Sequence, residues 1–223
     1  MGCSIARCID ASCVGPATRK SALDQLVEAS EKYNFICAFT MPCFTAELVE
    51  RLRGKETLVG GAVGFPSGAD TTAIKVASAK EMLKMGCDEL DTVINVGALL
   101  DGDFEYVKND FRAVVEAAEG IPVKSILEVT KLDDYSICKA SEICAKAGAA
   151  YIKTGTGWMT EPTTIRHVKL IKDTVGDAVK IKVAGGVRSL ETLLEMMDAG
   201  SCRFGIGLQS AIKIAEEAIA RGL

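Results

Sequence analysis

The sequence predicts an α/β protein of one domain, residues 1–223, in which eight strands alternate with eight helices and the strands close into a barrel. Short apolar runs alternate with amphipathic runs along the whole chain. The alternation repeats eight times, which is the number that closes a parallel barrel. No linker, low-complexity tract or break in composition divides the 223 residues, and this length is ordinary for one barrel domain.

The apolar runs are the expected strands. They lie near residues 5–10, 35–40, 57–65, 89–95, 122–130, 150–154, 179–184 and 203–206. Between them, apolar residues recur with the spacing of an amphipathic helix. The expected helices cover roughly 18–33, 45–53, 71–86, 103–119, 133–147, 162–175, 189–199 and 210–221.

Residues typical of helix ends support these boundaries. Asp103, Asp133 and Ser189 stand where N-caps are expected, and Pro162 stands in the first turn of a predicted helix. Glycines follow five of the predicted helices, as C-terminal caps often do. They are Gly54, Gly86, Gly120, Gly148 and Gly200.

An open, doubly wound parallel sheet would show the same alternation. Two observations favour closure instead. Eight units are the closure number, and no G-x-G-x-x-G motif follows the first strand. The sequence therefore predicts a single-domain (β/α)8 TIM barrel.

Composition and charge argue against several functions. A formal net charge of -4 and the lack of a basic run argue against nucleic-acid binding. His167 is the only histidine and no C-x-x-C occurs, so neither a metal site nor a cofactor is expected. The nine cysteines fit reduced thiols. With no apolar run of ~20 residues and no signal peptide, we expect a cytoplasmic protein without membrane contact.

Charged residues inside the expected strands indicate where the chemistry lies. Helices cover the outer face of such a barrel, so polar strand residues should point to the interior. By this argument Asp91, Lys124, Glu128, Lys153 and Lys182 all line one interior. Buried charges are costly unless they pair with one another.

Two interpretations of this cluster are open. It could be an ion-pair network that only stabilises the fold. However, Asp91, Lys153 and Lys182 lie near the C-terminal ends of their strands, where barrel enzymes carry their sites. A second ammonium nearby lowers the pKa of a lysine and so makes it a nucleophile toward carbonyls, while a carboxylate can move protons. Two lysines and one acid without metal ligands are the equipment of a Schiff-base aldolase.

Several motifs accompany these residues in a fixed order. They include Gly-Phe-Pro-Ser-Gly at 64–68, Asp-Glu-Leu-Asp-Thr-Val-Ile-Asn at 88–95, Ile-Lys-Thr-Gly-Thr-Gly at 152–157 and Lys-Val-Ala-Gly-Gly-Val-Arg at 182–188. In this order the chain resembles the deoxyribose-phosphate aldolase family, metal-free Schiff-base aldolases with a βα-barrel fold. The resemblance runs from Ile9 to the segment around Gly205.

The resemblance implies a reaction and the residues that perform it. The reaction is reversible cleavage of 2-deoxyribose 5-phosphate to acetaldehyde and glyceraldehyde 3-phosphate, without a cofactor, in a homodimer or higher homo-oligomer. By analogy Lys153 forms the Schiff base, Lys182 tunes it and Asp91 handles protons. The residues expected to contact the substrate are Asp10, Ser12, Cys37, Lys124, Thr156, Gly185, Gly186, Gly205 and Gly207.

Departures from the family pattern cluster at the end expected to bind phosphate. The usual Gly-x-Ser-Ser is Gly-Ile-Gly-Leu at 205–208, and Trp158 stands where many members have a cation. Backbone amides could still bind a phosphate, with Ser210 or Gln209 replacing the missing hydroxyls. Alternatively, the substrate carries no phosphate there and packs on Trp158.

Two other classes of function stay open at this point. A sugar-phosphate isomerase would need an acid–base pair but no neutral lysine. A barrel that only binds a ligand would have no use for an unpaired interior lysine, because burying one is costly.

Overall fold

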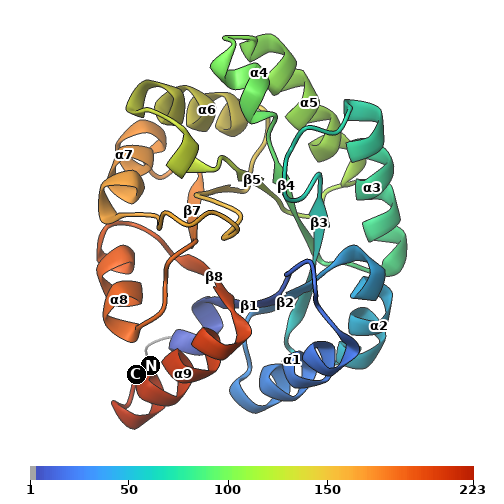
Figure 1. The fold of residues 1–223 in the computed structure, drawn as a ribbon, viewed down its shortest axis with the longest axis vertical. Helices are drawn as coiled ribbons and strands as arrows, with labels where there is room; N and C mark the ends of the chain where they lie inside the picture. The colour runs from blue at the N-terminus through green and yellow to red at the C-terminus, as the bar shows by residue number, and fades with distance from the viewer. Residues whose placement is uncertain (1–3) are drawn as a thin grey trace.

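The computed structural model describes residues 4–223, which form a closed barrel of eight parallel strands in chain order (Figure 1). The strands are β1 (Ile9–Cys13), β2 (Cys37–Thr40), β3 (Leu58–Val63), β4 (Glu89–Val93), β5 (Val123–Ile126), β6 (Tyr151–Lys153), β7 (Lys180–Ala184) and β8 (Arg203–Gly207). Pairing of β8 with β1 closes the barrel. The prediction of a TIM barrel is therefore confirmed.

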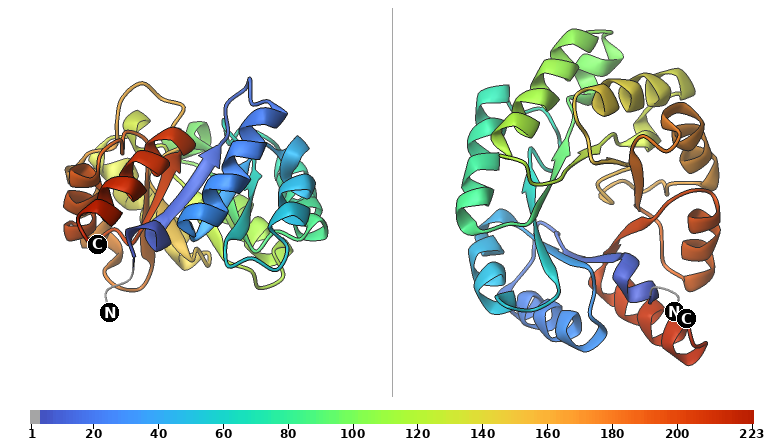
Figure 2. Two further views of the ribbon diagram at one scale, coloured as in Figure 1. Left: turned by 90° about the horizontal axis from the view of Figure 1, so that it is seen from below. Right: turned by 180° about the vertical axis from the view of Figure 1, so that it is seen from behind.

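A ring of helices covers the outside of the barrel (Figures 1 and 2). The helices are α1 (Lys20–Tyr33), α2 (Pro42–Leu52), α3 (Thr72–Met85), α4 (Val96–Leu100), α5 (Phe104–Ala117), α6 (Asp134–Lys146), α7 (Ile165–Val175), α8 (Leu190–Asp198) and α9 (Leu208–Ala220). Two short 3-10 helices, η1 (Ile5–Cys8) and η2 (Val129–Lys131), precede β1 and follow β5. Within residues 4–223, no helix combines the length and the apolar character needed to cross a bilayer.

Most helix boundaries agree with the sequence, and the N-caps Asp103, Asp133 and Ser189 are confirmed by their side-chain hydrogen bonds. The prediction for Pro162 is wrong, because α7 begins three residues later with Thr164 as its N-cap. The Thr164 hydroxyl accepts a hydrogen bond from the His167 backbone N–H, and His167 Nδ1 accepts one from the Thr164 N–H. This reciprocal capping fixes the helix start.

Two other segments differ from the prediction. Residues 5–8 form η1, so β1 runs later than the predicted strand at 5–10. The strand predicted at 122–130 ends at Ile126, because Glu128 adopts a left-handed conformation with φ 58°. The short helix α4 was not predicted; the Asn95 side chain caps it by accepting the Ala98 N–H at 3.0 Å.

The apolar core lies between the barrel and the helices. Outward-facing strand residues such as Leu90, Ile152 and Val183 are completely buried. On the helices, Leu23 and Phe111 are buried just as deeply. This shell excludes water from the barrel wall and leaves the interior to polar groups.

Inside the barrel, one aromatic ring depends on a glycine. A Cβ atom on Gly60 would lie 2.0 Å from Phe39 Cζ, so only glycine leaves room for that ring. The Phe39 ring then lies beneath the lysine side chains, with its centroid 4.3 Å from Lys182 Nζ. A cation over an aromatic face is stabilised by the ring quadrupole.

One ion pair is buried outside the barrel interior. Lys75 on α3 donates to Asp110 on α5 at 2.6 Å and to the carbonyl of Val93, at the end of β4, at 3.0 Å. Both side chains are at most 2% exposed. The pair therefore ties two helices to the C-terminal end of a strand.

We expect Asp110→Ala to lower the free energy of unfolding by about 3–5 kcal/mol, because it leaves the buried ammonium of Lys75 uncompensated. Urea unfolding followed by circular dichroism measures this change. Asp177→Ala is the control, since Asp177 pairs with Lys172 on the surface and its side chain is 99% exposed. Equal losses in both variants would contradict the prediction.

Candidate active site

Lys153, Lys182 and Asp91 meet inside the barrel, near the C-terminal ends of their strands. Lys153 is the last residue of β6 and lies in register with Lys182 on β7. Asp91 projects from β4, on the other side of the interior. Its Oδ2 accepts hydrogen bonds from Lys153 Nζ at 2.7 Å and from Lys182 Nζ at 2.6 Å. The two-residue periodicity of the strands predicted that these three side chains meet.

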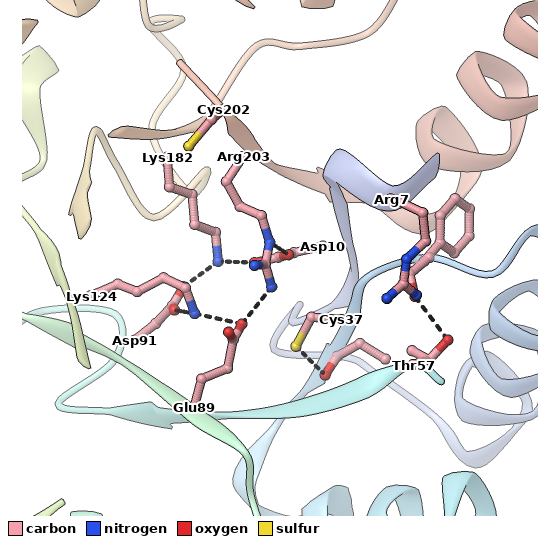
Figure 3. Close-up of polar contacts among 12 residues, drawn as sticks. Arg7, Asp10, Cys37, Thr57, Glu89, Asp91, Lys124, Lys182, Cys202 and Arg203 are labelled. Atoms are coloured by element: carbon pink, nitrogen blue, oxygen red, sulfur yellow. Dashed lines mark hydrogen bonds and ion pairs between the residues drawn. The ribbon is translucent and has the colours of Figure 1, made fainter. Parts of the chain in front are cut away.

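Asp91 also belongs to a larger set of ion pairs, drawn in Figure 3. Its Oδ1 lies 3.2 Å from Lys124 Nζ, which in turn lies 2.5 Å from Glu89 Oε1. Asp10 Oδ2 lies 2.5 Å from Lys182 Nζ. Arg203 joins the two ends, since it pairs with Asp10 and, at 2.8 Å, with Glu89.

These contacts set the charges of the groups. Burial lowers the pKa of Lys153, the Asp91 carboxylate raises it and the Lys182 ammonium lowers it again, which leaves a pKa of about 8. Burial alone raises the pKa of Asp91, but the cations of Lys153, Lys182 and Lys124 outweigh it and hold that pKa well below its usual range. An anionic carboxylate therefore faces an amine that loses its proton easily.

The amine of Lys153 is accessible from a cavity. Lys153 is 7% exposed, whereas Lys182 is 1% exposed. A narrow cavity of about 40 Å³ reaches both lysines and Asp91 between Phe39, Ala62 and Phe65. Ser12, Thr156 and Gly205 line it as well as a wider cavity of about 610 Å³ at the mouth of the barrel. A small carbonyl compound can reach Lys153 by this route while its other end lies in the wider cavity.

The wider cavity is formed by the loops after β1, β6, β7 and β8. The residues that line it include the predicted glycines Gly185, Gly186, Gly205 and Gly207. Ser210, in the first turn of α9, also lines it, whereas Gln209 faces a neighbouring groove. Glycine walls expose backbone amides, and the N-terminus of a helix attracts anions.

Trp158 closes one side of this cavity and also packs against other loops. Its indole N–H donates to the carbonyl of Val14 at 2.9 Å, which links the loop after β6 to the loop after β1. Its ring meets Phe65 edge-on, with centroids 5.5 Å apart. Figure 2 shows these loops rising from one end of the barrel. Trp158 is therefore both a wall of the cavity and a packing residue between loops.

Three of the expected residues line neither cavity, although Lys124 lies in the barrel interior as predicted. Lys124 and Cys37 are fully buried and line neither cavity. Lys124 pairs with carboxylates below the cavity floor. Glu128 lies beyond β5, where its carboxylate accepts the Thr156 N–H at 3.1 Å and the Thr156 hydroxyl at 2.5 Å. Because β5 ends at Ile126, Glu128 lies outside the strand, and its carboxylate instead fixes the loop after β6 through Thr156.

Arg203 belongs to this cluster but was not predicted from the sequence. Arg203 opens the last apolar run, where an arginine is ordinarily the exposed end of a strand. Its position two residues before Gly205, which lines the narrow cavity, places it on the same inward face. That alternation was the available signal. Glu89, two residues before Asp91 on the same face of β4, was not predicted to take part in the cluster either.

One trio in the described chain, Asp10, Cys37 and Glu89, brings potential metal ligands within 4.8 Å of one another. The trio does not fit a cation. Both carboxylates already pair with Arg203, and burial beside Glu89 raises the pKa of the Cys37 thiol well above its usual value. A thiol that stays protonated is a poor metal ligand.

The fold and the cluster define a class: a (β/α)8-barrel enzyme with a lysine amine at the floor of its cavity. Comparison with known proteins narrows the class. Residues 29–210 match the model of the DeoC/LacD family aldolases. The chain belongs to this family.

Individual relatives agree with the family assignment. The deoxyribose-phosphate aldolase of Sinorhizobium medicae (strain WSM419) is 45% identical over 217 residues, which cover 97% of this chain and 88% of the relative. The solved structure of the aldolase QR15 is 32% identical with a TM-score of 0.92, covering 98% and 97% of the two chains. The tetrameric deoxyribose phosphate aldolase from Aeropyrum pernix is 26% identical with a TM-score of 0.87, covering 97% and 91%.

We expect Lys153 to react with small aldehydes at a rate that rises with pH and levels off above about 8. Only the neutral amine is nucleophilic, so with a pKa of about 8 its neutral fraction is about a tenth at pH 7 and about nine tenths at pH 9. Reductive labelling followed by peptide mass mapping measures this rate. A rate still rising at pH 10, as for an ordinary lysine, would contradict the prediction.

Proposed function

We propose that this chain, acting as a single domain over residues 1–223, reversibly cleaves 2-deoxyribose 5-phosphate to acetaldehyde and glyceraldehyde 3-phosphate. The observation that carries the proposal is the amine of Lys153, reachable from the cavity and held 2.7 Å from Asp91 beside Lys182. A neutral amine, a charged neighbour and a carboxylate are what Schiff-base cleavage needs. A barrel isomerase would have no use for such an amine.

The reaction begins when Lys153 Nζ attacks the C1 aldehyde of the open-chain sugar. Loss of water from the carbinolamine gives a protonated imine, and Asp91, which contacts Nζ at 2.7 Å, transfers protons in this step. Lys182, which shares the same carboxylate oxygen, disfavours protonation of Lys153. Lys153 is therefore available again after each turnover.

Cleavage then breaks the C2–C3 bond. The C3 hydroxyl loses its proton and becomes the aldehyde of glyceraldehyde 3-phosphate, while the electron pair of the bond moves toward the imine nitrogen and leaves an enamine. Protonation of C2 and addition of water release acetaldehyde and free Lys153. Asp91, held 2.7 Å from Nζ, accepts the proton of the C3 hydroxyl, directly or through a water, and returns a proton to C2.

The wider cavity supports a phosphate at the far end of the substrate. Gly185, Gly186, Gly205 and Gly207 border it, and α9 begins there without a side-chain cap. Uncapped backbone amides at a helix start are suited to an anion. Arg188 is the one charged side chain among the cavity's lining residues. Together these groups compensate, in phosphate binding, for the two hydroxyls that are absent at Gly207 and Leu208.

A second candidate is an aldolase of the same family that acts on a different or unphosphorylated sugar. The observation that favours it is Trp158, whose ring forms one wall of the wider cavity. A sugar face can pack on such a ring without needing charge. The chemistry at Lys153 would be the same, so only the preferred substrate separates the two candidates.

The proposal includes the setting of the enzyme. We place it in the cytoplasm, where reduced cysteines persist, and we expect a homo-oligomer that needs neither a cofactor nor a nucleic-acid or membrane partner. The tetramer of the Aeropyrum pernix relative supports the expectation of self-association.

Borohydride reduction in the presence of acetaldehyde or 2-deoxyribose 5-phosphate should add mass to the peptide that contains Lys153. Lys153→Ala should abolish both the label and the cleavage but stay folded, because Asp91 keeps Lys182 and Lys124 as partners. Lys180→Ala is the matched control, since this exposed lysine begins β7. A fully active Lys153→Ala variant would contradict the proposed mechanism.

Arg188→Ala should raise KM for 2-deoxyribose 5-phosphate by about tenfold or more, the effect of one hydrogen bond to a charged group. KM for unphosphorylated 2-deoxyribose should stay unchanged, because that sugar carries no phosphate for Arg188 to bind. Steady-state assays with both sugars measure the difference. Arg166→Ala, an exposed change on α7, is the control. If both KM values rise together, Arg188 shapes the loop and does not bind the phosphate.

A further inference from the structure

The ion pairs beneath the cavity form a closed ring. The role inferred below for this ring rests on the proposed function of Lys153 as the Schiff-base amine. Around the ring, acids and bases alternate, so that every acid contacts two cations and every cation contacts two acids (Figure 3). The members in order are Arg203, Asp10, Lys182, Asp91, Lys124 and Glu89. We call this set the ion-pair ring.

The ion-pair ring is neutral by itself. It holds three carboxylates and three cations, each with two opposite charges in contact. Lys153 is a seventh group, attached to the ring through Asp91. When Lys153 is protonated, the buried cluster carries one uncompensated positive charge; when it is neutral, the cluster is balanced. A net charge in a buried place is costly.

Other titratable groups near the ring do not change this balance of positive and negative charges. Cys37 on β2 stays a neutral thiol, because burial and the adjacent Glu89 raise its pKa well above the usual value. Tyr151 on β6 presents its ring to Lys124 and Arg203. Glu128 follows β5 and is bound by Thr156; within residues 4–223 it makes no ion pair with the ring. The segment of β3 that lines the narrow cavity contributes Ala62.

Two ring members lie away from the reacting atoms. Arg203 and Glu89 line neither cavity, and they are 4% and 3% exposed. Lys153 pairs with Asp91 and with neither of them. They pair with each other at 2.8 Å and so close the ring on the side opposite Asp91. Any effect they have on Lys153 must act through charge or through the ring.

We infer that Arg203 and Glu89 are positioning residues of the aldolase: by closing a neutral ring, they make the amine of Lys153 the surplus charge, so that the site favours its neutral, nucleophilic form. Arg203 and Glu89 must both be present to keep the ring neutral. Without the arginine, the remaining carboxylates outnumber the ring lysines and a protonated Lys153 restores balance. Without the glutamate carboxylate, the cations already outnumber the acids and Lys153 loses its proton more readily.

The test measures the pKa of Lys153 in two variants that must shift it in opposite directions. Arg203→Met should raise this pKa by about one unit or more, about a tenfold loss of neutral amine at pH 7, and Glu89→Gln should lower it by a similar amount. Arg203→Lys keeps the charge and should behave like the unmodified protein. The double change Arg203→Met with Glu89→Gln restores the balance and should bring the pKa back.

The readout is reductive ethylation of Lys153 with acetaldehyde and cyanoborohydride between pH 6 and 10. The amine and the aldehyde form an imine with loss of water, and hydride from cyanoborohydride reduces it to a secondary amine. Peptide mass mapping gives the rate at Lys153, and exposed Lys180 in the same digest corrects for the reagent. Labelling needs no cleavage of a sugar, so it tests the ring even if 2-deoxyribose 5-phosphate is not a substrate.

Asp110→Asn is the matched control, because it disrupts a buried ion pair outside the barrel interior and should lower thermal stability without moving the pKa of Lys153. Glu89→Gln keeps the shape of the side chain, so this variant decides the question even if Arg203→Met does not fold. The inference is overturned if Glu89→Gln leaves the pKa unchanged or raises it. Shifts in the same direction in both single variants would also overturn it.

Discussion

The carboxylate of Asp91 is the group on which the site depends. Three ammonium groups converge on its two oxygens, at 2.6, 2.7 and 3.2 Å. Burial penalises an isolated carboxylate heavily, yet the pKa of Asp91 is held well below its usual range because these cations outweigh burial. The same interaction opposes the loss of a proton from Lys153. The charge of Lys153, the nucleophile of the proposed reaction, is therefore a compromise between burial, which favours the neutral amine, and the contact with Asp91, which favours the charged form.

The fold makes this compromise possible by separating two environments. Helices bury the apolar outer face of the strands, so the stability of the barrel does not depend on an apolar interior. Parallel register places Lys153, Lys182 and Arg203 abreast on three neighbouring strands. Three adjacent cations would repel one another, and the acids of β1 and β4 reach across the interior to separate them.

Much of this arrangement could be predicted from the sequence, because alternation along a strand decides which side chains meet. Asp91, Lys153 and Lys182 were predicted to share the interior for that reason, and they do. Glu128 was misplaced because alternation holds only while the strand continues, and a left-handed residue ends it. Arg203 was missed because a cation at the first position of an apolar run ordinarily marks an exposed end. Its burial depends on Asp10 and Glu89, which lie far away in the sequence.

The two ends of the site also differ in how far the sequence determines them. Strand residues on a closed barrel form the end of the site that holds Lys153, so their geometry follows from register. Loops and the start of α9 form the distal end, where a contact such as that between Trp158 and Val14 joins segments 144 residues apart. The departures from the family pattern at Gly207 and Leu208 lie at this distal end. The ion-pair ring makes its contacts among strand residues. Substitutions at the distal end can therefore change which substrate binds, while the ring still controls the charge of Lys153.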